Sequence, residues 1–447
     1  MTQVLRYFDN PVTLYRRLQS MGTCTLLDSG ASPRHGRWDI VAAAPRRSLH
    51  LDSWADPDEA VIRDWALEGQ SHDRALDIVP AAAHLPFHGG LIGHLSYDLG
   101  RRLQRMENHR DSDGAALPQL VIHEYDWAVV QDRIRRESWL TGCPDAPTVQ
   151  EIEERLQGDD PSDAPFTLKH PFAADWDFPR YTAAFDQAKE LIAAGDCYQI
   201  NLGQPHRAPY QGDLVTAYDR LRGIARAPFS ALLPLDEDHL LLSLSPERYL
   251  TTDGQTVETR PIKGTRPRSN DEAIDAAAAR DLLSSEKERA ENLMIVDLMR
   301  NDLGKFCETG SITVDELFGL ESYATVHHLV SVIRGQLRHD TTPLALLLGC
   351  LPGGSITGAP KRRAMEIIDH LEPASRQAWC GSIFYWSRHG RMDSSITIRT
   401  LFNQAGELHC WAGGGLVHDS QARAEYRELE HKVGAFLRCL EQDFKAP

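Results

Sequence analysis

The stretch "LPGGSITGAPKRRAMEII", residues 351–368, places a glycine-rich turn directly before an amphipathic helix. Free N–H groups in such a turn suit an anion, although the stretch does not match the GxxxxGK[ST] pattern of a nucleotide-binding loop. A tight structural turn is the alternative. Apolar residues at helical spacing follow the turn, and they predict a helix with one buried face.

The elements on both sides of this turn do not alternate strictly between strand and helix. Residues 181–196, 284–304 and 424–442 have apolar positions at helical spacing. Residues 239–250 are typical of a strand that runs into a turn, and residues 394–402 are strand-like. The central helix starts at a serine and ends in an Asn/Gly-containing stretch, as capped helices do. The mixture favours the α+β class over a doubly wound parallel sheet.

A segment rich in Pro, Asp and Gly, residues 146–175, divides the chain into two regions. It is typical of a linker or a surface excursion. We expect an N-terminal region over residues 1–145 and a catalytic region over residues 176–447. The catalytic region holds most of the candidate functional residues.

Composition narrows the class of protein. The chain has 447 residues and a formal net charge of −16, which argues against a nucleic-acid partner because phosphate binding needs a basic surface. Its eight cysteines form no CxxC pair, which indicates reduced thiols. The N-terminus has no apolar signal segment, and the apolar run at 344–351 is far shorter than the roughly 20 residues of a membrane span. We expect a cytoplasmic protein without a membrane partner.

Two pairs of carboxylates lie on predicted helices. Glu288 and Glu291 are three residues apart, as are Glu425 and Glu428, so each pair shares one helix face. A solvated acidic face is the simpler explanation of either pair. If the two helices face each other, the four carboxylates repel unless a hard cation lies among them. Oxygen-only ligands at this density suit Mg²⁺.

Other residues are candidates for chemistry or binding. Lys263, in "RPIKGTRPR", points into water in an ordinary turn but is a candidate nucleophile if it points into a pocket. Glu247 follows a predicted strand and a proline, where acid–base groups are common. Arg399 lies in the strand-like stretch 394–402, where it either pairs with an anion or lies at a surface edge. His328 is either a base or a core histidine.

These residues lie in stretches that resemble the chorismate-utilising enzymes, in that family's order along the chain. The stretches are "SPERY", "RPIKGTRPR", "ERAENLMIVDLMRNDLG", "VHHLVS", "LPGGSITGAPKRRAMEII", "CGSI", "SSITIRT", "GGGLVHDS" and "EYRELEHK". The N-terminal "LLDSG" and "LSYDLGRR" extend the resemblance over the whole chain. The resemblance implies one chorismate-binding fold, like that of anthranilate synthase component I, with packed β-sheets and helices outside.

The resemblance also implies roles for residues. Glu291 and Glu428 would ligate Mg²⁺, with Glu288 and Glu425 in support, and the metal would hold the ring carboxylate of chorismate. His328 would be the family's active-site histidine. The implied substrate-binding residues are Arg399, Tyr385, Thr357, Lys432 and the backbone of Gly414 and Gly415.

Lys263 indicates the branch of the family. Anthranilate synthases have "PIAGT" here, whereas the aminodeoxychorismate-forming branch has "PIKGT", as this chain does. The resemblance implies that Lys263 attacks carbon 2 of chorismate, that Glu247 acts as general acid for the leaving hydroxyl on carbon 4, and that ammonia then displaces the lysine. Gln199 stands where isochorismate synthases carry a water-activating lysine. The implied activity is that of a transferase on the route to para-aminobenzoate and folate. The alternatives are the anthranilate-forming branch and an idle binding subunit.

Three further expectations come from the resemblance. No stretch resembles a glutamine amidotransferase, so a separate glutaminase subunit is expected to form a heterodimer and supply the ammonia. Phe384 replaces a glycine that the family usually has, which puts the role of the adjacent Tyr385 in doubt. A tryptophan site, or merely an ordinary strand and turn, is expected at Asp28, Ser29, Pro228, Phe229 and Ser230.

Overall fold

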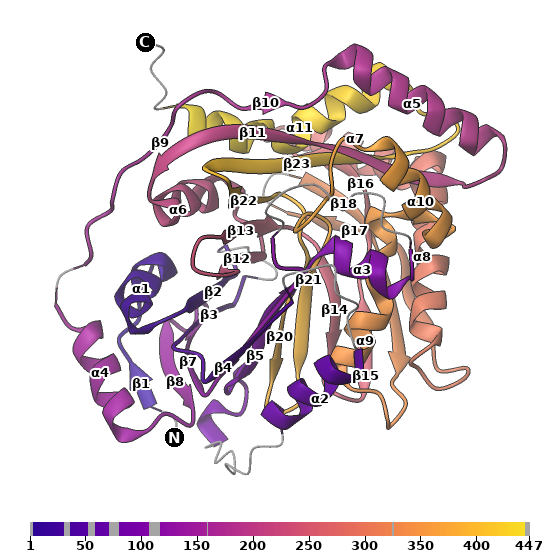
Figure 1. Cartoon of the computed structure of the whole chain (residues 1–447). Helices are drawn as coiled ribbons and strands as arrows, with labels where there is room; N and C mark the ends of the chain where they lie inside the picture. Colours follow the sequence, from indigo (N-terminus) through magenta and orange to yellow (C-terminus); the bar gives the residue numbers. More distant parts are fainter. Residues whose placement is uncertain are drawn as a thin grey trace.

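The computed structural model describes residues 3–30, 36–51, 59–70, 80–106, 117–158, 160–323 and 326–442. Within these residues the chain forms two sheets that pack on each other, with helices outside them (Figure 1). All strand pairs in the described residues are antiparallel. The expected α+β fold of packed sheets is confirmed.

The larger sheet has thirteen strands among the described residues. In spatial order they are β1 (Gln3–Leu5), β8 (Glu137–Gly142), β7 (Trp127–Asp132), β3 (Trp38–Ala43), β2 (Cys24–Asp28), β12 (Phe229–Pro234), β13 (Leu240–Ser245), β22 (Thr400–Gln404), β23 (Glu407–Leu416), β11 (Gln199–Gly212) and β10 (Ala173–Ala174), while β19 (Gly358–Ala359) and β9 (Phe166–Leu168) also pair with β11.

The smaller sheet has ten strands in the same part of the chain. They are β16 (Ile262–Pro267), β18 (Val326–Gln336), β15 (Thr256–Thr259), β14 (Arg248–Thr252), β21 (Met392–Ile396), β20 (Ser382–Ser387), β5 (Gly90–Leu95), β6 (Leu120–Tyr125) and β4 (Arg47–Leu51), while β17 (Thr313–Ser322) pairs with β18.

Helices cover the outer faces of both sheets (Figure 1). They are α1 (Pro11–Leu18), α2 (Glu59–Gln70), α3 (Tyr97–Leu103), α4 (Ala146–Leu156), α5 (Phe178–Ala193), α6 (Leu214–Ala225), α7 (Glu272–Ser284), α8 (Glu286–Gly304), α9 (Pro343–Cys350), α10 (Lys361–Leu371) and α11 (Ala422–Glu441), with short 3₁₀ turns η1 (Gln19–Met21), η2 (Pro80–Ala82) and η3 (Gly354–Ile356). No helix in the described residues has both the length and the apolar content to cross a membrane.

Two hydrophobic cores follow from the alternation of side chains along strands. Ile40 and Ala42 of β3 point into the core between the sheets, whereas Val41 and Ala43 point to the core under the outer helices. Because both faces of β3 are covered, its sequence is apolar almost throughout rather than alternating.

The N-terminal and catalytic regions contribute strands to both sheets. Strands β1, β8, β7, β3 and β2 of the N-terminal region extend the larger sheet beyond β12, and β5, β6 and β4 extend the smaller sheet beyond β20. Residues 146–175 contain α4, β9 and β10, and both of these strands pair with β11. The packing therefore joins the two regions through shared sheets.

The long helix α8 begins where its sequence predicts. The hydroxyl of Ser285 accepts a hydrogen bond from the backbone N–H of Glu288, which caps the first turn. The acidic residues Glu286 and Glu288 in that turn also suit the positive end of the helix dipole. Local sequence therefore fixes the start of the helix that carries one of the two carboxylate pairs.

The prediction of one strand over residues 394–402 is wrong. The segment splits into β21, which belongs to the smaller sheet, and β22, which belongs to the larger one. Between them the chain changes sheets, and Arg399 takes a left-handed conformation with φ of 51°. A single strand cannot lie in two sheets at once, so the β-branched run is interrupted there.

Candidate active site

Glu247 and Arg399 lie at two adjacent crossings between the sheets. Glu247 lies between β13 of the larger sheet and β14 of the smaller sheet. In the same way, Arg399 lies between β21 of the smaller sheet and β22 of the larger sheet. The backbone N–H of Leu244 donates to the carbonyl of Arg399 at 3.0 Å, and that of Ile396 donates to the carbonyl of Glu247 at 3.2 Å. The fold thus brings together two residues that lie about 150 positions apart along the chain.

Burial changes the acid–base behaviour of both side chains. Glu247 is 6% exposed, and burial raises its pKa to about 6 against the opposing charge of Lys263. Burial lowers the pKa of Arg399, and the Glu247 carboxylate opposes that shift. In the described part of the chain, the guanidinium of Arg399 has no direct ion pair or hydrogen bond, and Glu247 acts on it only through the charge of its carboxylate. It is therefore available for an anionic group of a bound molecule.

Lys263 points inward from a bulge in β16. Gly264, with φ of 76°, interrupts the register between β16 and β18 directly after the lysine. The Nζ atom donates to the carbonyl of Ser355 at 3.1 Å. Burial lowers the pKa of Lys263, while the carboxylates of Glu291 and Glu247 oppose the shift. The half-buried amine is thus held between carboxylates rather than in open water.

His328 lies on β18, opposite Thr265 of β16. Its Nδ1 atom is 2.9 Å from the Thr265 hydroxyl oxygen, and its ring meets that of Tyr323 edge-on. Burial lowers the pKa of His328 to about 4, so the ring is neutral at neutral pH. The structure places it beside the lysine-bearing strand, as a neutral imidazole.

The predicted carboxylates on α8 and α11 do face each other. Lys287 on α8 lies 3.8 Å from Glu291 of its own helix and 4.0 Å from Glu425 of α11. Burial raises the pKa of Glu291, and repulsion from Glu288 and Glu425 adds to the rise. The simpler explanation, two unrelated solvated faces, is therefore wrong for Glu291 and Glu425.

The remaining two carboxylates have basic partners. Glu428, whose side chain is 52% exposed, lies 2.8 Å from Lys432, and that ammonium lowers the pKa of the carboxyl. Glu288 lies 3.4 Å from Arg266. Among the described residues, no three His, Cys, Asp or Glu side chains are grouped closely enough to hold a metal ion by themselves. The donors are nevertheless all oxygens, and their mutual repulsion is what a hard cation would relieve.

The glycines of β23 line the space beside these carboxylates. The ammonium group of Lys432 donates to the carbonyl of Gly413 at 3.0 Å. A Cβ atom on Gly414 would lie 3.5 Å from Glu425, whereas one on Gly415 would lie 2.3 Å from the Gln199 amide. The backbone at Gly414 therefore has free space on the side of Glu425. At Gly415 a side chain would collide with Gln199, so glycine is needed there.

Thr357 supports the adjacent turn. Its side chain is fully buried, and its hydroxyl donates to the carbonyl of Gly353 at 3.0 Å. Ser355, which the sequence did not single out, contacts Lys263 directly through its carbonyl. In the sequence, only the position of Ser355 within the glycine-rich stretch points to a role in the site.

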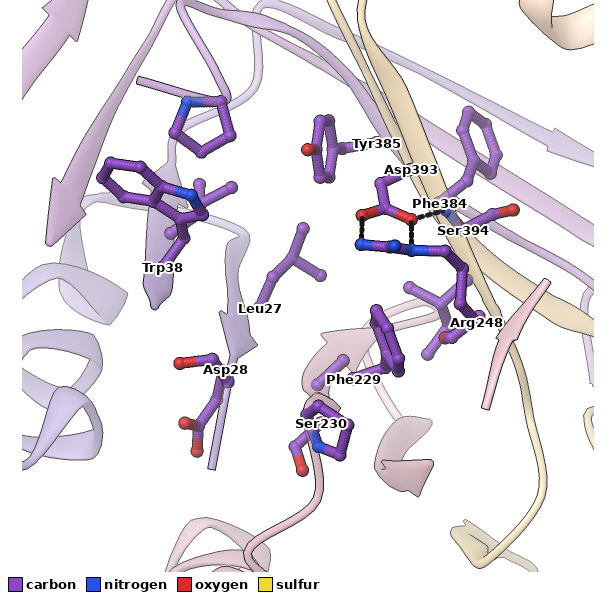
Figure 2. Close-up of a pocket in the computed structure, with 17 residues that line it drawn as sticks. Leu27, Asp28, Trp38, Phe229, Ser230, Arg248, Phe384, Tyr385, Asp393 and Ser394 are labelled. Atoms are coloured by element: carbon purple, nitrogen blue, oxygen red, sulfur yellow. Dashed lines mark hydrogen bonds and ion pairs between the residues drawn. The ribbon is translucent and has the colours of Figure 1, made fainter. Parts of the chain in front are cut away.

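The structure does not bring Tyr385 to the Lys263 group. Tyr385 lines a separate cavity of about 110 Å³, together with Trp38, Phe229 and the ion pair between Arg248 and Asp393 (Figure 2). Successive residues of β20 point to opposite faces, and the face of Tyr385 meets the N-terminal strands. Its expected contact with the substrate carboxylates therefore has no support in this geometry.

The residues expected to form a tryptophan site line this same cavity. Asp28, however, already accepts hydrogen bonds from Arg222, from the Tyr218 hydroxyl and from a backbone N–H. The Ser29 hydroxyl donates to Asp39 at 2.9 Å. The cavity is thus lined mainly by apolar and aromatic groups, with the carboxylate and hydroxyl of these two residues engaged elsewhere.

Comparisons with known proteins agree with this arrangement. The sequence profile of the family described as "chorismate binding enzyme" matches residues 23–438. Aminodeoxychorismate synthase component 1 of Klebsiella aerogenes is 44% identical over 446 residues, with 95% of each chain covered. Anthranilate synthase component 1 of Thermus thermophilus is 36% identical, with 97% of this chain and 96% of the relative covered.

A solved structure shows the same fold. Anthranilate synthase component I of Streptococcus pneumoniae superimposes with a TM-score of 0.77 at 28% identity, covering 90% of this chain and 92% of that one. The matched family profile and both relatives extend over the two sheets and the site between them. The chain therefore belongs to the chorismate binding enzyme family.

Proposed function

We propose that this chain converts chorismate and ammonia into aminodeoxychorismate, as an aminodeoxychorismate synthase component 1. The observation that carries the proposal is the half-buried amine of Lys263, held at 3.1 Å from the Ser355 carbonyl between the charges of Glu291 and Glu247. Relatives of that name share more of the sequence than the anthranilate synthase does, 44% against 36%.

The chemistry requires opposite protonation states of two neighbouring groups. The unprotonated amine of Lys263 attacks carbon 2 of the ring while the double bonds shift and the hydroxyl on carbon 4 leaves. The protonated form of Glu247, which burial favours, gives the proton that turns the leaving hydroxyl into water. Ammonia then bonds to carbon 4, the double bonds shift back, and the carbon–nitrogen bond to Lys263 breaks. The enolpyruvyl group is retained throughout.

Recognition of the substrate falls to residues around these two. The unpaired guanidinium of Arg399 would hold a carboxylate of chorismate. Lys432 lies near enough to Lys263 to lower its pKa further, and its ammonium group donates to the carbonyl of Gly413. Glu291 and Glu428 would hold Mg²⁺, with Glu288 and Glu425 in support through water. A bound Mg²⁺ would neutralise the ring carboxylate.

The product of the purified chain tests the proposal. Chorismate, Mg²⁺ and ammonium are incubated with the chain at a series of pH values from about 6 upward, and the product is identified by mass. We expect aminodeoxychorismate, with no release of pyruvate. Anthranilate with released pyruvate would support the alternative activity, and untouched chorismate would overturn both.

Ammonia is proposed to come from a separate glutaminase subunit. The relatives are named as component 1, which indicates an enzyme of more than one component. The cavity of Figure 2 is in turn the proposed place for tryptophan, because Trp38, Phe229 and Tyr385 offer aromatic walls to an indole ring.

Replacing Glu428 by glutamine is expected to weaken Mg²⁺ and chorismate binding together, each by about tenfold, because a formal charge leaves the ligand set. The measurement is the Mg²⁺ concentration for half-maximal rate and the KM for chorismate. The matched variant Glu430→Gln changes an exposed carboxylate on the same helix and should leave both values as they are. An unaltered Mg²⁺ dependence in Glu428→Gln would remove that residue from the metal site.

A further inference from the structure

Arg376 is a buried arginine in the connection between α10 and β20, and only 1% of it is exposed. Its guanidinium donates to both carboxylate oxygens of Glu372, at 2.8 and 2.6 Å. The rings of Tyr97 and Trp379 lie on it, each with its centroid 4.6 Å from Cζ. The guanidinium of Arg376 is thus fixed by hydrogen bonds to a carboxylate and by contacts with two aromatic rings.

Stability alone does not account for such an ion pair. Removing two charges from water costs several kcal/mol for each ion, and well-packed apolar groups of similar volume often stabilise a core equally well or better. What the pair provides is fixed geometry, because a guanidinium directs its N–H groups along set lines in one plane. The other hydrogen-bond partners of Arg376 and Glu372 therefore show which segments of the chain the ion pair fixes in place.

Those bonds join the turn η3 to the strand β11. Arg376 donates to the carbonyl of Ile356 in the turn at 2.9 Å and to the carbonyl of Asn201 in the strand at 2.5 Å. Its partner Glu372 accepts from the backbone N–H of Gly203, two residues further along that strand, at 2.8 Å. The ion pair therefore contacts β11 twice and the turn once.

The same turn contacts both reacting groups. The carbonyl of Ser355 accepts the hydrogen bond from Lys263 at 3.1 Å. The Ser355 side chain lies near enough to Glu247 to lower the pKa of that carboxyl, against the rise caused by burial. Ser355 is the neighbour of Ile356, to which Arg376 is bonded. The turn thus has the buried ion pair on one side and the proposed nucleophile and acid on the other.

We propose that Arg376 is a positioning residue for the reaction, which fixes η3 so that Ser355 holds Lys263 and Glu247 at the distance the chemistry needs. The inference rests on the proposed function, because it assigns those two residues their roles. Arg376 itself touches neither of them in the described contacts. Its effect should therefore appear in the chemical step rather than in substrate binding.

Replacing Arg376 by lysine keeps the charge but removes the planar fork, so one ammonium cannot reach Glu372, Ile356 and Asn201 in the same directions. We expect kcat to fall about 10²-fold, as small displacements of reacting groups do, with KM for chorismate changed by less than about threefold. The matched control is Arg388→Lys, because Arg388 is also buried and pairs with buried Glu124 at 3.2 Å. Its kcat should stay near the wild-type value.

Thermal unfolding shows whether each variant is folded. If Arg376→Lys is not folded, Glu372→Gln is measured in its place. Glu372→Gln keeps the shape of the pair and should lower kcat in the same way but by a smaller factor. A kcat equal to that of Arg388→Lys, or a loss that lies wholly in KM, would overturn the inference. A wild-type product other than aminodeoxychorismate would instead overturn the proposed function, and the kcat and KM for that product would still decide the role of Arg376.

Discussion

Replacing Lys263 by alanine is expected to lower the formation of aminodeoxychorismate by about 10³-fold or more, because the covalent route then has no nucleophile. The change removes the amine that donates to Ser355 but leaves Arg399 and the carboxylates of α8 and α11 in place. Chorismate should therefore still bind. The measurements are the rate of product formation and the KM for chorismate, with ammonium as the nitrogen source.

The control for this variant is Lys169→Ala, which removes an exposed lysine. It should turn over at the wild-type rate. Slow formation of anthranilate by Lys263→Ala is compatible with the account, because that reaction does not need the lysine. Full formation of aminodeoxychorismate by the variant would show that the nucleophile is another group.

Replacing Glu247 by glutamine is expected to lower kcat by about 10²- to 10⁴-fold, the usual cost of losing a positioned general acid. Burial raises the pKa of Glu247 to about 6, so its carboxyl loses the proton it must give as the pH rises through that value. Lys263 has the opposite requirement, because it attacks only after losing its own proton. The wild-type rate should therefore rise and then fall with pH, because the reactive form needs Glu247 protonated and Lys263 unprotonated at the same time.

The pH profile of kcat checks this assignment. Glu247→Gln cannot lose a proton in this range, so its profile should lack the falling limb while keeping the rising one. The variant Glu286→Gln, which changes a residue in the first turn of α8, should keep the wild-type profile. A falling limb that persists in Glu247→Gln would assign the acid to a different group.

Sequence predicts best the features that depend on neighbouring residues. Helix α8 starts after Ser285 because a serine hydroxyl caps its first turn, and that signal is local. The spacing of Glu288 and Glu291 places both on one face for the same reason. The resemblance to the family implies what spacing does not, that Glu291 and Glu428 on two helices share one site with Glu288 and Glu425 in support. The structure brings Glu291 and Glu425 to the same lysine, Lys287.

Sequence fails where the fold changes a strand's surroundings. The run around Arg399 is β-branched and predicts one strand, but the two halves pair with different sheets, and no local pattern marks such a crossing. Tyr385 is placed by the face of β20 on which it lies, and the sequence does not show which face meets the N-terminal strands. Arg376 and Glu372, four residues apart, have the spacing of an ordinary surface ion pair, yet both are buried.

Lys263 is expected to form a covalent bond to the substrate, and the mass of the chain after incubation with chorismate and Mg²⁺ without ammonia tests this expectation. We expect the mass to increase by that of chorismate minus one water. Peptide mass spectrometry should locate the added mass on the peptide that contains Lys263, and ammonium should remove it. No such adduct, or an adduct on a different residue, would contradict this expectation.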